Sequence, residues 1–360
     1  MPQSQKPDIK SMSLPQLKAA ITELGERSFR ATQIYEWMHT KLAEDFASMT
    51  NLSASLRDQL HNRFSYTVLH PVLVRQSERD ATRKYLFQLP DGHMIETVLM
   101  NYRHGNSVCI SSQVGCRMGC AFCASTIGGL ERSLTAAEML EQIYAVTRHS
   151  GERVSNIVVM GIGEPLDNYD NLLNFINMIS DENGLNISQR AITVSTCGLV
   201  PEIYRLAEAG LKITLALSLH APTDKQRQAL MPIARRYSLA EVMDACADYF
   251  NKTGRRVTFE YSLMAGENDS QEDATALIAL IRPLGAHINL IPVNPVEERS
   301  FNLPTGKKIQ EFKNKLEKNQ INVTIRREMG RDIEGACGQL RRLHQQSLRE
   351  ENHAEIGCFD

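Results

Sequence analysis

Residues 191–219 read AITVSTCGLVPEIYRLAEAGLKITLALSL, and this stretch decides the fold class. It opens with the β-branched run AITVST at 191–196 and closes with the apolar run KITLALSL at 212–219. Such runs predict buried strands, and the residues between them have a helical pattern. A strand, a helix and a second strand in succession predict a parallel βαβ unit.

The same alternation extends in both directions, from about residue 131 to about residue 328. Helical stretches such as LTAAEMLEQIYAVTRH (134–149) and SLAEVMDACADYFNKT (238–253) lie beside strand-like runs. Six such units predict a partial (β/α) barrel or a doubly wound sheet, and barrel active sites lie at the carboxyl ends of the strands. The six strand-like runs are SNIVVMG (155–161), AITVST (191–196), KITLALSL (212–219), RVTFEYSL (256–263), HINLIPV (287–293) and NVTIRR (322–327).

The chain before these units has two different patterns. From residue 13 to about residue 64, apolar residues recur at helical spacing, and Ser28 is placed to cap the second of three helices. This region either only packs or docks RNA. Between 70 and 112 the period shifts to two, which predicts an antiparallel meander. We therefore divide the chain into a helical accessory domain (1–66), a β-extension (67–112), a core (113–343) and a flexible tail (344–360).

Composition limits the class of protein further. The chain has 360 residues, 40 of them basic and 42 acidic, and its net charge of -2 excludes a strongly basic nucleic-acid binder. No run of 18 apolar residues occurs, so we expect no membrane span. The first residues have no apolar segment typical of a signal peptide, and we expect a cytoplasmic protein. No coiled-coil heptads appear, and we expect a monomer.

Four of the eight cysteines fall within fifteen residues, and three of them form the motif Cys116-x3-Cys120-x2-Cys123. Clustered thiolates select zinc or an iron–sulfur cluster. Structural zinc takes four ligands, whereas three cysteines on a [4Fe–4S] cluster leave one iron open. Cys109 could complete a zinc site, so zinc remains an alternative. A redox dithiol at CAFC would leave Cys116 without a role.

A second motif follows the first predicted strand of the core, where SNIVVMGIGEPLDN contains Gly161, Gly163, Glu164 and Pro165. A glycine pair after a strand is also typical of a dinucleotide-binding turn. The third glycine of that fingerprint is missing here, and Pro165 interrupts the motif. Both features disfavour a dinucleotide-binding fold.

CxxxCxxC at the entry of a series of βα units resembles the radical S-adenosylmethionine (SAM) superfamily, and the GIGE segment resembles its SAM-binding motif. Within this superfamily, the sequence most resembles the RlmN/Cfr family of RNA adenine methyltransferases. It implies a partial (β/α)6 barrel of the radical SAM type with a small N-terminal helical domain and a β-extension. The segments that carry it are CISSQVGCRMGCAFCAST, MGIGEPLDN, ITVST, LSLHAP, RVTFEYSL, INLIPVNP and TIRREMGRDIEGACGQL.

The resemblance also implies a mechanism. Cys337 takes a methyl group from one SAM, and a second SAM is cleaved at the [4Fe–4S] cluster to a radical that activates this methyl group. After the carbon adds to the adenine, Glu96 accepts the proton and Cys109 releases the product through a disulfide. Without the resemblance, Glu96 would be a solvated strand residue, Cys109 a core residue, and Cys337 a plain buried cysteine.

The remaining implications concern binding. The family's substrates are 23S rRNA and tRNA, and its electron donor is flavodoxin-like. Arginines 326, 327, 331, 341 and 342 flank Cys337 and suit phosphate contacts. Two alternatives remain: a C8-specific methyltransferase of the Cfr type, and a zinc-stabilised RNA-binding protein without catalysis. The predicted SAM contacts are Gly163, Glu164, Ser195, Ser218, Leu219, His220 and Asn294.

Overall fold

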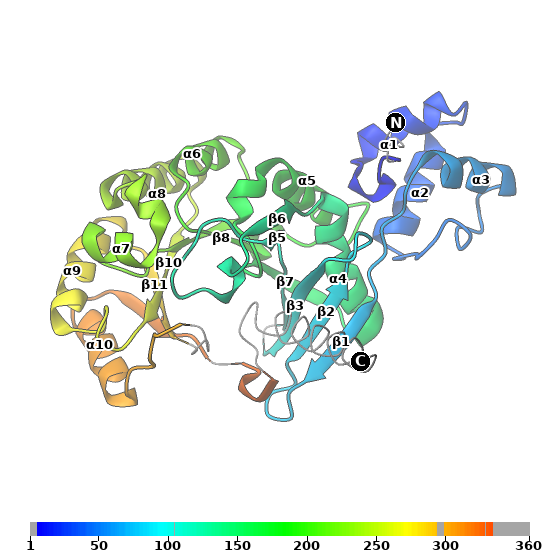
Figure 1. The fold of residues 1–360 in the computed structure, drawn as a ribbon. Helices are drawn as coiled ribbons and strands as arrows, with labels where there is room; N and C mark the ends of the chain where they lie inside the picture. Colours follow the sequence, from blue (N-terminus) through cyan, green and yellow to red (C-terminus); the bar gives the residue numbers. More distant parts are fainter. Residues whose placement is uncertain (1–5, 104, 294–298, 328, 334–360) are drawn as a thin grey trace, which may run out of the picture.

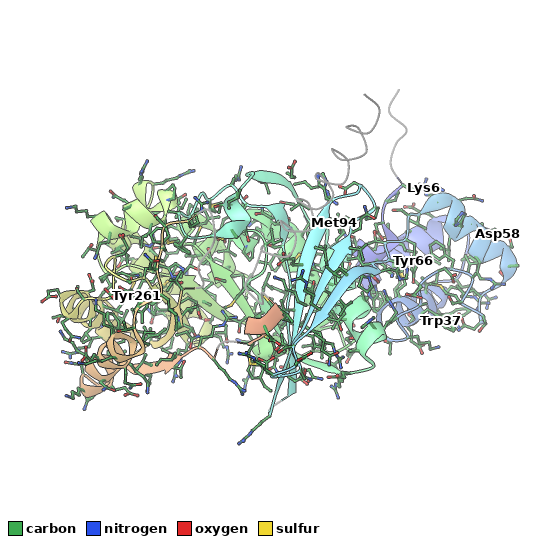
Figure 2. The ribbon with its side chains drawn as sticks, turned by 60° about the horizontal axis from the view of Figure 1, so that its bottom comes forward. Lys6, Trp37, Asp58, Tyr66, Met94 and Tyr261 are labelled. Atoms are coloured by element: carbon green, nitrogen blue, oxygen red, sulfur yellow. The ribbon has the colours of Figure 1, made fainter. Side chains whose placement is uncertain are left out.

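The computed structural model describes residues 6–103, 105–293, 299–327 and 329–333. Helices lie along the outer side of a curved sheet, and a small helical region lies at one end of the molecule (Figure 1). Figure 2 labels Trp37, Asp58 and Tyr66 in that helical region and Tyr261 near the opposite end. No helix in the described ranges is long and apolar enough to cross a membrane.

The N-terminal region contains the three predicted helices, α1 (Leu14–Glu23), α2 (Phe29–His39) and α3 (Ala54–Arg63). Their apolar residues at helical spacing are buried against one another. The predicted cap at Ser28 is wrong, because its side chain makes no capping hydrogen bond. The region is fastened to the core by a buried ion pair in which Lys10 Nζ lies 2.5 Å from Glu141 Oε1.

In the described part of the chain, ten strands form one sheet, in the order β1-β2-β3-β4-β7-β8-β9-β10-β11-β12. The first four are antiparallel: β1 (Pro71–Gln76), β2 (Arg83–Gln88), β3 (Met94–Tyr102) and β4 (Gly105–Cys109). The other six are parallel and confirm the six predicted core strands: β7 (Val154–Val159), β8 (Ile192–Thr196), β9 (Thr214–Ser218), β10 (Val257–Leu263), β11 (His287–Pro292) and β12 (Asn322–Ile325).

Strand β4 joins the two halves, since it pairs antiparallel with β3 and parallel with β7. The predicted meander is therefore continuous with the core sheet rather than a layer beside it. Among the described strands, β1 and β12 are the two edges, so the barrel is open. A separate pair, β5 (Gln113–Gly115) and β6 (Leu130–Ser133), flanks the segment that carries the cysteine motif.

Helices cover the outer face between successive strands. The helix after the cysteine motif is α4 (Ala136–Ser150), and its Gln142 accepts a 2.9 Å hydrogen bond from Thr97 on β3. That contact places α4 on one face of the sheet and leaves the other face to the site. The remaining helices are α5 (Tyr169–Ile179), α6 (Val200–Glu208), α7 (Asp224–Leu230), α8 (Leu239–Thr253), α9 (Gln271–Ile281) and α10 (Gly306–Lys318).

Candidate functional site

A cavity lies at the carboxyl ends of β7, β8 and β9, where the sequence analysis places the active site. Of the predicted site residues, Cys116, Cys120, Cys123, Gly163, Glu164, Ser195, Ser218 and His220 line it. Leu219 is fully buried and does not line it; its backbone N–H donates to the carbonyl of Glu260 at 3.0 Å. Asn294 and Cys337 lie outside the described residues.

The three thiols stand in apolar surroundings that include Met118, Met231 and Met264. Burial raises the pKa of the Cys116 thiol to about 12, so ionisation there requires a bound cation. No three metal-ligating side chains in the described ranges are arranged to hold a metal ion. A [4Fe–4S] cluster takes each thiolate on a separate iron, so three thiols that share one apolar cavity fit its chemistry.

Backbone hydrogen bonds hold the segment that carries the thiols. The N–H of Ala121, between Cys120 and Cys123, donates to the carbonyl of Leu230 at 2.8 Å. The Thr126 hydroxyl donates to the Cys123 carbonyl at 2.9 Å. The spacing of the cysteines is thereby fixed by contacts to α7 and to the turn that follows.

Close approach of two chain segments explains the glycines of the GIGE motif. Gly163 has φ +112°, and a Cβ at this position would lie 2.6 Å from the Cβ of Gln113. A Cβ at Gly161 would lie 2.7 Å from the Ile110 carbonyl oxygen. Any side chain would push the loop away from β4 and β5, so glycine is required at both positions.

Glu164 is buried and held by backbone donors. Its Oε2 accepts from the Cys197 N–H at 2.8 Å, and its Oε1 accepts from the Leu166 N–H at 3.1 Å. Its own N–H donates to the Gln113 side-chain oxygen at 2.9 Å. Burial raises the pKa of Glu164. A buried carboxylate at a strand end suits an ammonium group such as the one that SAM carries.

A second part of the cavity lining, at the ends of β8 and β9, presents hydroxyl and imidazole groups. The Ser195 and Ser218 hydroxyl oxygens lie 3.3 Å apart at the ends of β8 and β9. His220 Nδ1 accepts from the Ser262 N–H at 2.9 Å, and its ring packs edge-on against Phe122. Burial lowers the pKa of His220 to about 3, so its imidazole is neutral at physiological pH. The wall therefore offers neutral hydrogen-bonding groups.

Strand register places Glu96 and Cys109 on the same face of the sheet as this wall. Val98 of β3 pairs with Cys109 of β4, and Cys109 pairs with Val158 of β7. Paired residues share a face, as do residues two apart on one strand, so Glu96 lies on the same face, one row away from Cys109. Continuing the pairing through β8 and β9 brings Ser195 and Ser218 onto this face.

Both Glu96 and Cys109 are buried, which fits the interpretation of Cys109 as a core residue but not that of Glu96. Glu96 is only 3% exposed, and Lys84 Nζ on β2 lies 3.1 Å from its Oε2, so the interpretation as a solvated strand residue is wrong. Cys109 packs with Met160, which itself lines the cavity. One apolar cluster thus contains Cys109 and a residue of the cavity lining, and Glu96 lies on the strand next to Cys109.

Sequence reasoning missed three residues of this region. Gln113 orients the GIGE loop, and Glu260 is a buried carboxyl group beside Ser218 in the register of β9 and β10. Arg227 is a buried cation behind the cavity wall. The first two lie inside quoted segments but form no recognised motif. Arg227 belongs to the polar stretch DKQRQAL, whose composition is typical of a solvated helix.

Comparisons with known proteins agree with this geometry. The model of the Radical SAM superfamily matches residues 110–278, and that of the ribosomal RNA large subunit methyltransferase N-terminal domain matches residues 8–65. The probable dual-specificity RNA methyltransferase RlmN of Lachnospira eligens is 58% identical over 343 residues, covering 95% of this chain and 98% of the relative. Its namesake from Lysinibacillus sphaericus is 53% identical, covering 94% and 90%.

A solved structure is similar over nearly the whole chain. The radical SAM methyltransferase from Sphaerobacter thermophilus has a TM-score of 0.89 and 43% sequence identity, covering 92% of this chain and 98% of that one. Fold and site thus define a radical SAM enzyme, whose cofactors are a [4Fe–4S] cluster and SAM. More closely, the chain belongs to the RlmN family of RNA methyltransferases. The noncatalytic zinc-protein alternative is thereby wrong.

Proposed function

We propose that this chain methylates C2 of an adenosine in the peptidyl-transferase region of 23S rRNA and of the adenosine 3′ to the anticodon in some tRNAs. The observation that carries the proposal is that Glu96, Cys109 and the two cavity serines, Ser195 and Ser218, lie on the same inner face of the sheet. The relatives' name, dual-specificity RNA methyltransferase, supports two RNA substrates.

Cys116, Cys120 and Cys123 would hold the cluster, and Gly163, Glu164, Ser195, Ser218, Leu219, His220 and Asn294 would hold SAM. When bound, the cluster supplies the electron that cleaves SAM reductively. Two SAM molecules are used per turnover, one as methyl donor and one as radical source. The carboxylate of Glu164 would bind the SAM ammonium group, and the serine hydroxyls would orient the bound molecule.

Three residues would carry the transfer itself. Adenine C2 is electron-poor and does not attack a methyl cation equivalent, so the carbon must come from a protein-bound carrier. Cys337 would be that carrier, as its thiolate displaces the methyl group of SAM. Glu96 would accept the C2 proton. Cys109, after losing its thiol proton, would then attack the Cys337 sulfur to form a disulfide. The electron pair of the bond from that sulfur to the transferred carbon would pass to the carbon, which would take up a proton and become the methyl group.

The rest of the chain completes the proposal. The helical accessory domain (1–66) would dock RNA, next to the β-extension (67–112) and the core (113–343). A flavodoxin-like protein would supply single electrons. We infer that the enzyme acts in the cytoplasm, where its RNA substrates are made, and as a monomer.

The test is the position of the methyl group. Protein reconstituted without air would be incubated with SAM, a one-electron reductant and 23S rRNA or tRNA, and the digested nucleosides compared with 2-methyladenosine and 8-methyladenosine. The proposal expects 2-methyladenosine. 8-Methyladenosine would instead show the Cfr-type specificity and contradict the proposed site of methylation.

The Cys109→Ala variant tests the release step. Without the resolving thiol, a covalent protein–RNA adduct should accumulate and survive denaturing electrophoresis. Cys246→Ala is the matched control, because Cys246 is buried in α8 away from the cavity. Absence of any adduct in Cys109→Ala, with methylation intact, would exclude the resolving role.

A further inference from the structure

Arg227 lies in α7, the short helix that follows β9, and its side chain is fully buried. Arginine is almost never fully buried unless its donors are engaged. Burial lowers the pKa of Arg227, but a guanidinium keeps its charge in proteins. A permanent positive charge therefore stands inside the protein, behind the cavity wall.

Three of its hydrogen bonds reach the ends of two strands. Nη2 donates to the Cys197 carbonyl at 2.6 Å and to the Ser218 carbonyl at 3.4 Å, and Nε donates to the Leu219 carbonyl at 3.3 Å. Cys197 directly follows β8, whereas Ser218 and Leu219 end β9 and begin the next turn. One side chain thus joins the strand ends that present Ser195 and Ser218 to the cavity.

The far end of α7 contacts the cysteine motif. The carbonyl of Leu230, the last residue of α7, accepts the hydrogen bond from Ala121 between Cys120 and Cys123. Met231, the next residue, lines the cavity itself. Residues 227–231 therefore connect the strand ends that carry Ser195 and Ser218 with the segment that carries the thiols.

One nitrogen of Arg227 is left over from these contacts. Nη1 is buried and has no hydrogen-bond partner among the described residues. A buried donor without a partner costs free energy, so such groups are rare unless a bound group completes them. Cys197, whose carbonyl accepts from Arg227 Nη2 at 2.6 Å, lines the same cavity as Cys116, Cys120 and Cys123. The buried positive charge is therefore close enough to influence what the thiols bind.

We propose that Arg227 is a positioning residue that holds the SAM-binding strand ends against the cluster-bearing segment and favours the reduced cluster by its charge. This inference rests on the proposed cluster and SAM sites, and not on the later steps at adenine. Reduction adds one electron from an external low-potential donor, which makes the cluster more negative. A buried positive charge stabilises the more negative form and raises the reduction potential.

Two substitutions separate the two contributions. Arg227→Met removes the charge and the three donors at similar volume, whereas Arg227→Lys keeps the charge and loses the forked geometry. Arg255→Met is the matched control, because Arg255 donates to Ile213 and Thr214 at the opposite end of the same strand β9. All variants are compared as full-length, cluster-loaded protein.

The measurements are the SAM dissociation constant and the cluster midpoint potential, the latter from a reductive titration followed by electron paramagnetic resonance. Arg227→Met should weaken SAM binding by about tenfold or more and shift the potential to more negative values. Arg227→Lys should weaken SAM binding but keep a potential near that of the wild type. Arg255→Met should change neither quantity.

Wild-type values of both quantities in both Arg227 variants would overturn the proposal. Should Arg227→Met fail to fold, Arg227→Lys decides alone: unchanged SAM affinity contradicts the role of the guanidinium fork, and weakened affinity at wild-type potential supports it. Wild-type protein without any cluster signal would instead contradict the proposed cluster site itself. The two failures are therefore distinguishable.

Discussion

The two halves of the sheet hold their reactive groups in different ways. At the parallel half, Glu164 lies in a loop beyond β7, and two backbone N–H groups hold its carboxylate. At the antiparallel half, Glu96 lies within β3 on a buried face, and the ammonium group of Lys84 balances its charge. A loop can turn spare backbone donors towards a carboxylate. A strand interior cannot, because the sheet already uses its donors, so the counter-charge comes from the neighbouring strand.

This difference predicts different costs of substitution. A group held by backbone donors can change to a neutral isostere with little loss of stability, because the donors keep an acceptor. A buried ion pair loses stability when either partner is removed, because the other charge stays buried. The predictions below test that contrast, starting from the largest effect.

The largest effect is expected at the cysteine motif. Cys120→Ala should lose the cluster, because two cysteines cannot hold it in place of three. Methyl transfer to RNA should then fall to the uncatalysed background, a loss of at least about 10⁶-fold. Iron and sulfide content of the anaerobically purified protein checks the cause, with Cys246→Ala as the control that keeps both. Full iron content in Cys120→Ala would contradict the assignment of this thiol.

The second-largest effect is expected at Glu96 in the antiparallel half of the sheet. Glu96→Gln should lower methyl transfer by about 10²–10⁴-fold, as expected for loss of a proton acceptor. It should also lower the free energy of unfolding by about 3–5 kcal/mol, because the buried Lys84 ammonium group loses the carboxylate charge that lies 3.1 Å away. Lys84→Met should lower stability similarly.

The double variant Lys84→Met/Glu96→Gln separates stability from catalysis. It should regain most of the unfolding free energy in denaturant titrations while methyl transfer stays low. Additive destabilisation in the double variant would show that the two side chains are not energetically coupled. Restored methylation would show that Glu96 acts only through folding.

The fold was largely predictable because each strand is indicated by a short run of neighbouring residues in the sequence. All six parallel strands follow from β-branched or apolar runs, as expected for the strands of a parallel sheet. The continuity of the sheet through β4 was not predictable, because pairing between β4 and β7 joins residues such as Cys109 and Val158 that lie far apart in sequence. Ser28 shows a further limit, as a capping residue type need not form the cap.

The site was predictable where its residues lie in short loops. The cysteine motif and the GIGE segment have compact spacings that geometry requires, as the contacts at Gly161 and Gly163 demonstrate. The alternation around Glu96 predicts its face but not whether that face meets water or protein. Arg227 was missed because a polar helix conceals a buried cation. The roles assigned to Cys109 and Cys337 remain predictions from family resemblance.

A smaller effect is expected at the parallel half. Glu164→Gln keeps an acceptor for the Cys197 and Leu166 N–H groups, so the free energy of unfolding should change by no more than about 1 kcal/mol. The SAM dissociation constant should rise by about 10–100-fold, because the ammonium group loses its charged partner. Scanning calorimetry of unfolding and titration calorimetry of SAM binding check these two expectations. A loss of stability as large as that of Glu96→Gln would remove the contrast between the two halves.

The smallest effect is expected at Cys197. Burial raises the pKa of this thiol well above its usual value, and both its backbone N–H and its thiol contact the Glu164 carboxyl group, a contact that a serine hydroxyl can keep. Cys197→Ser should therefore keep iron content and SAM affinity within about twofold of the wild type. Loss of iron in this variant would make Cys197 a cluster ligand and require a revised ligand set.

The most direct test of the whole account is the mass of the peptide that carries Cys337, taken from protein purified without air. The account predicts one added methyl group on this thiol, absent from a Cys337→Ala variant that keeps its cluster. An unmodified Cys337 in protein that contains an intact cluster and binds SAM would contradict the methyl-carrier mechanism.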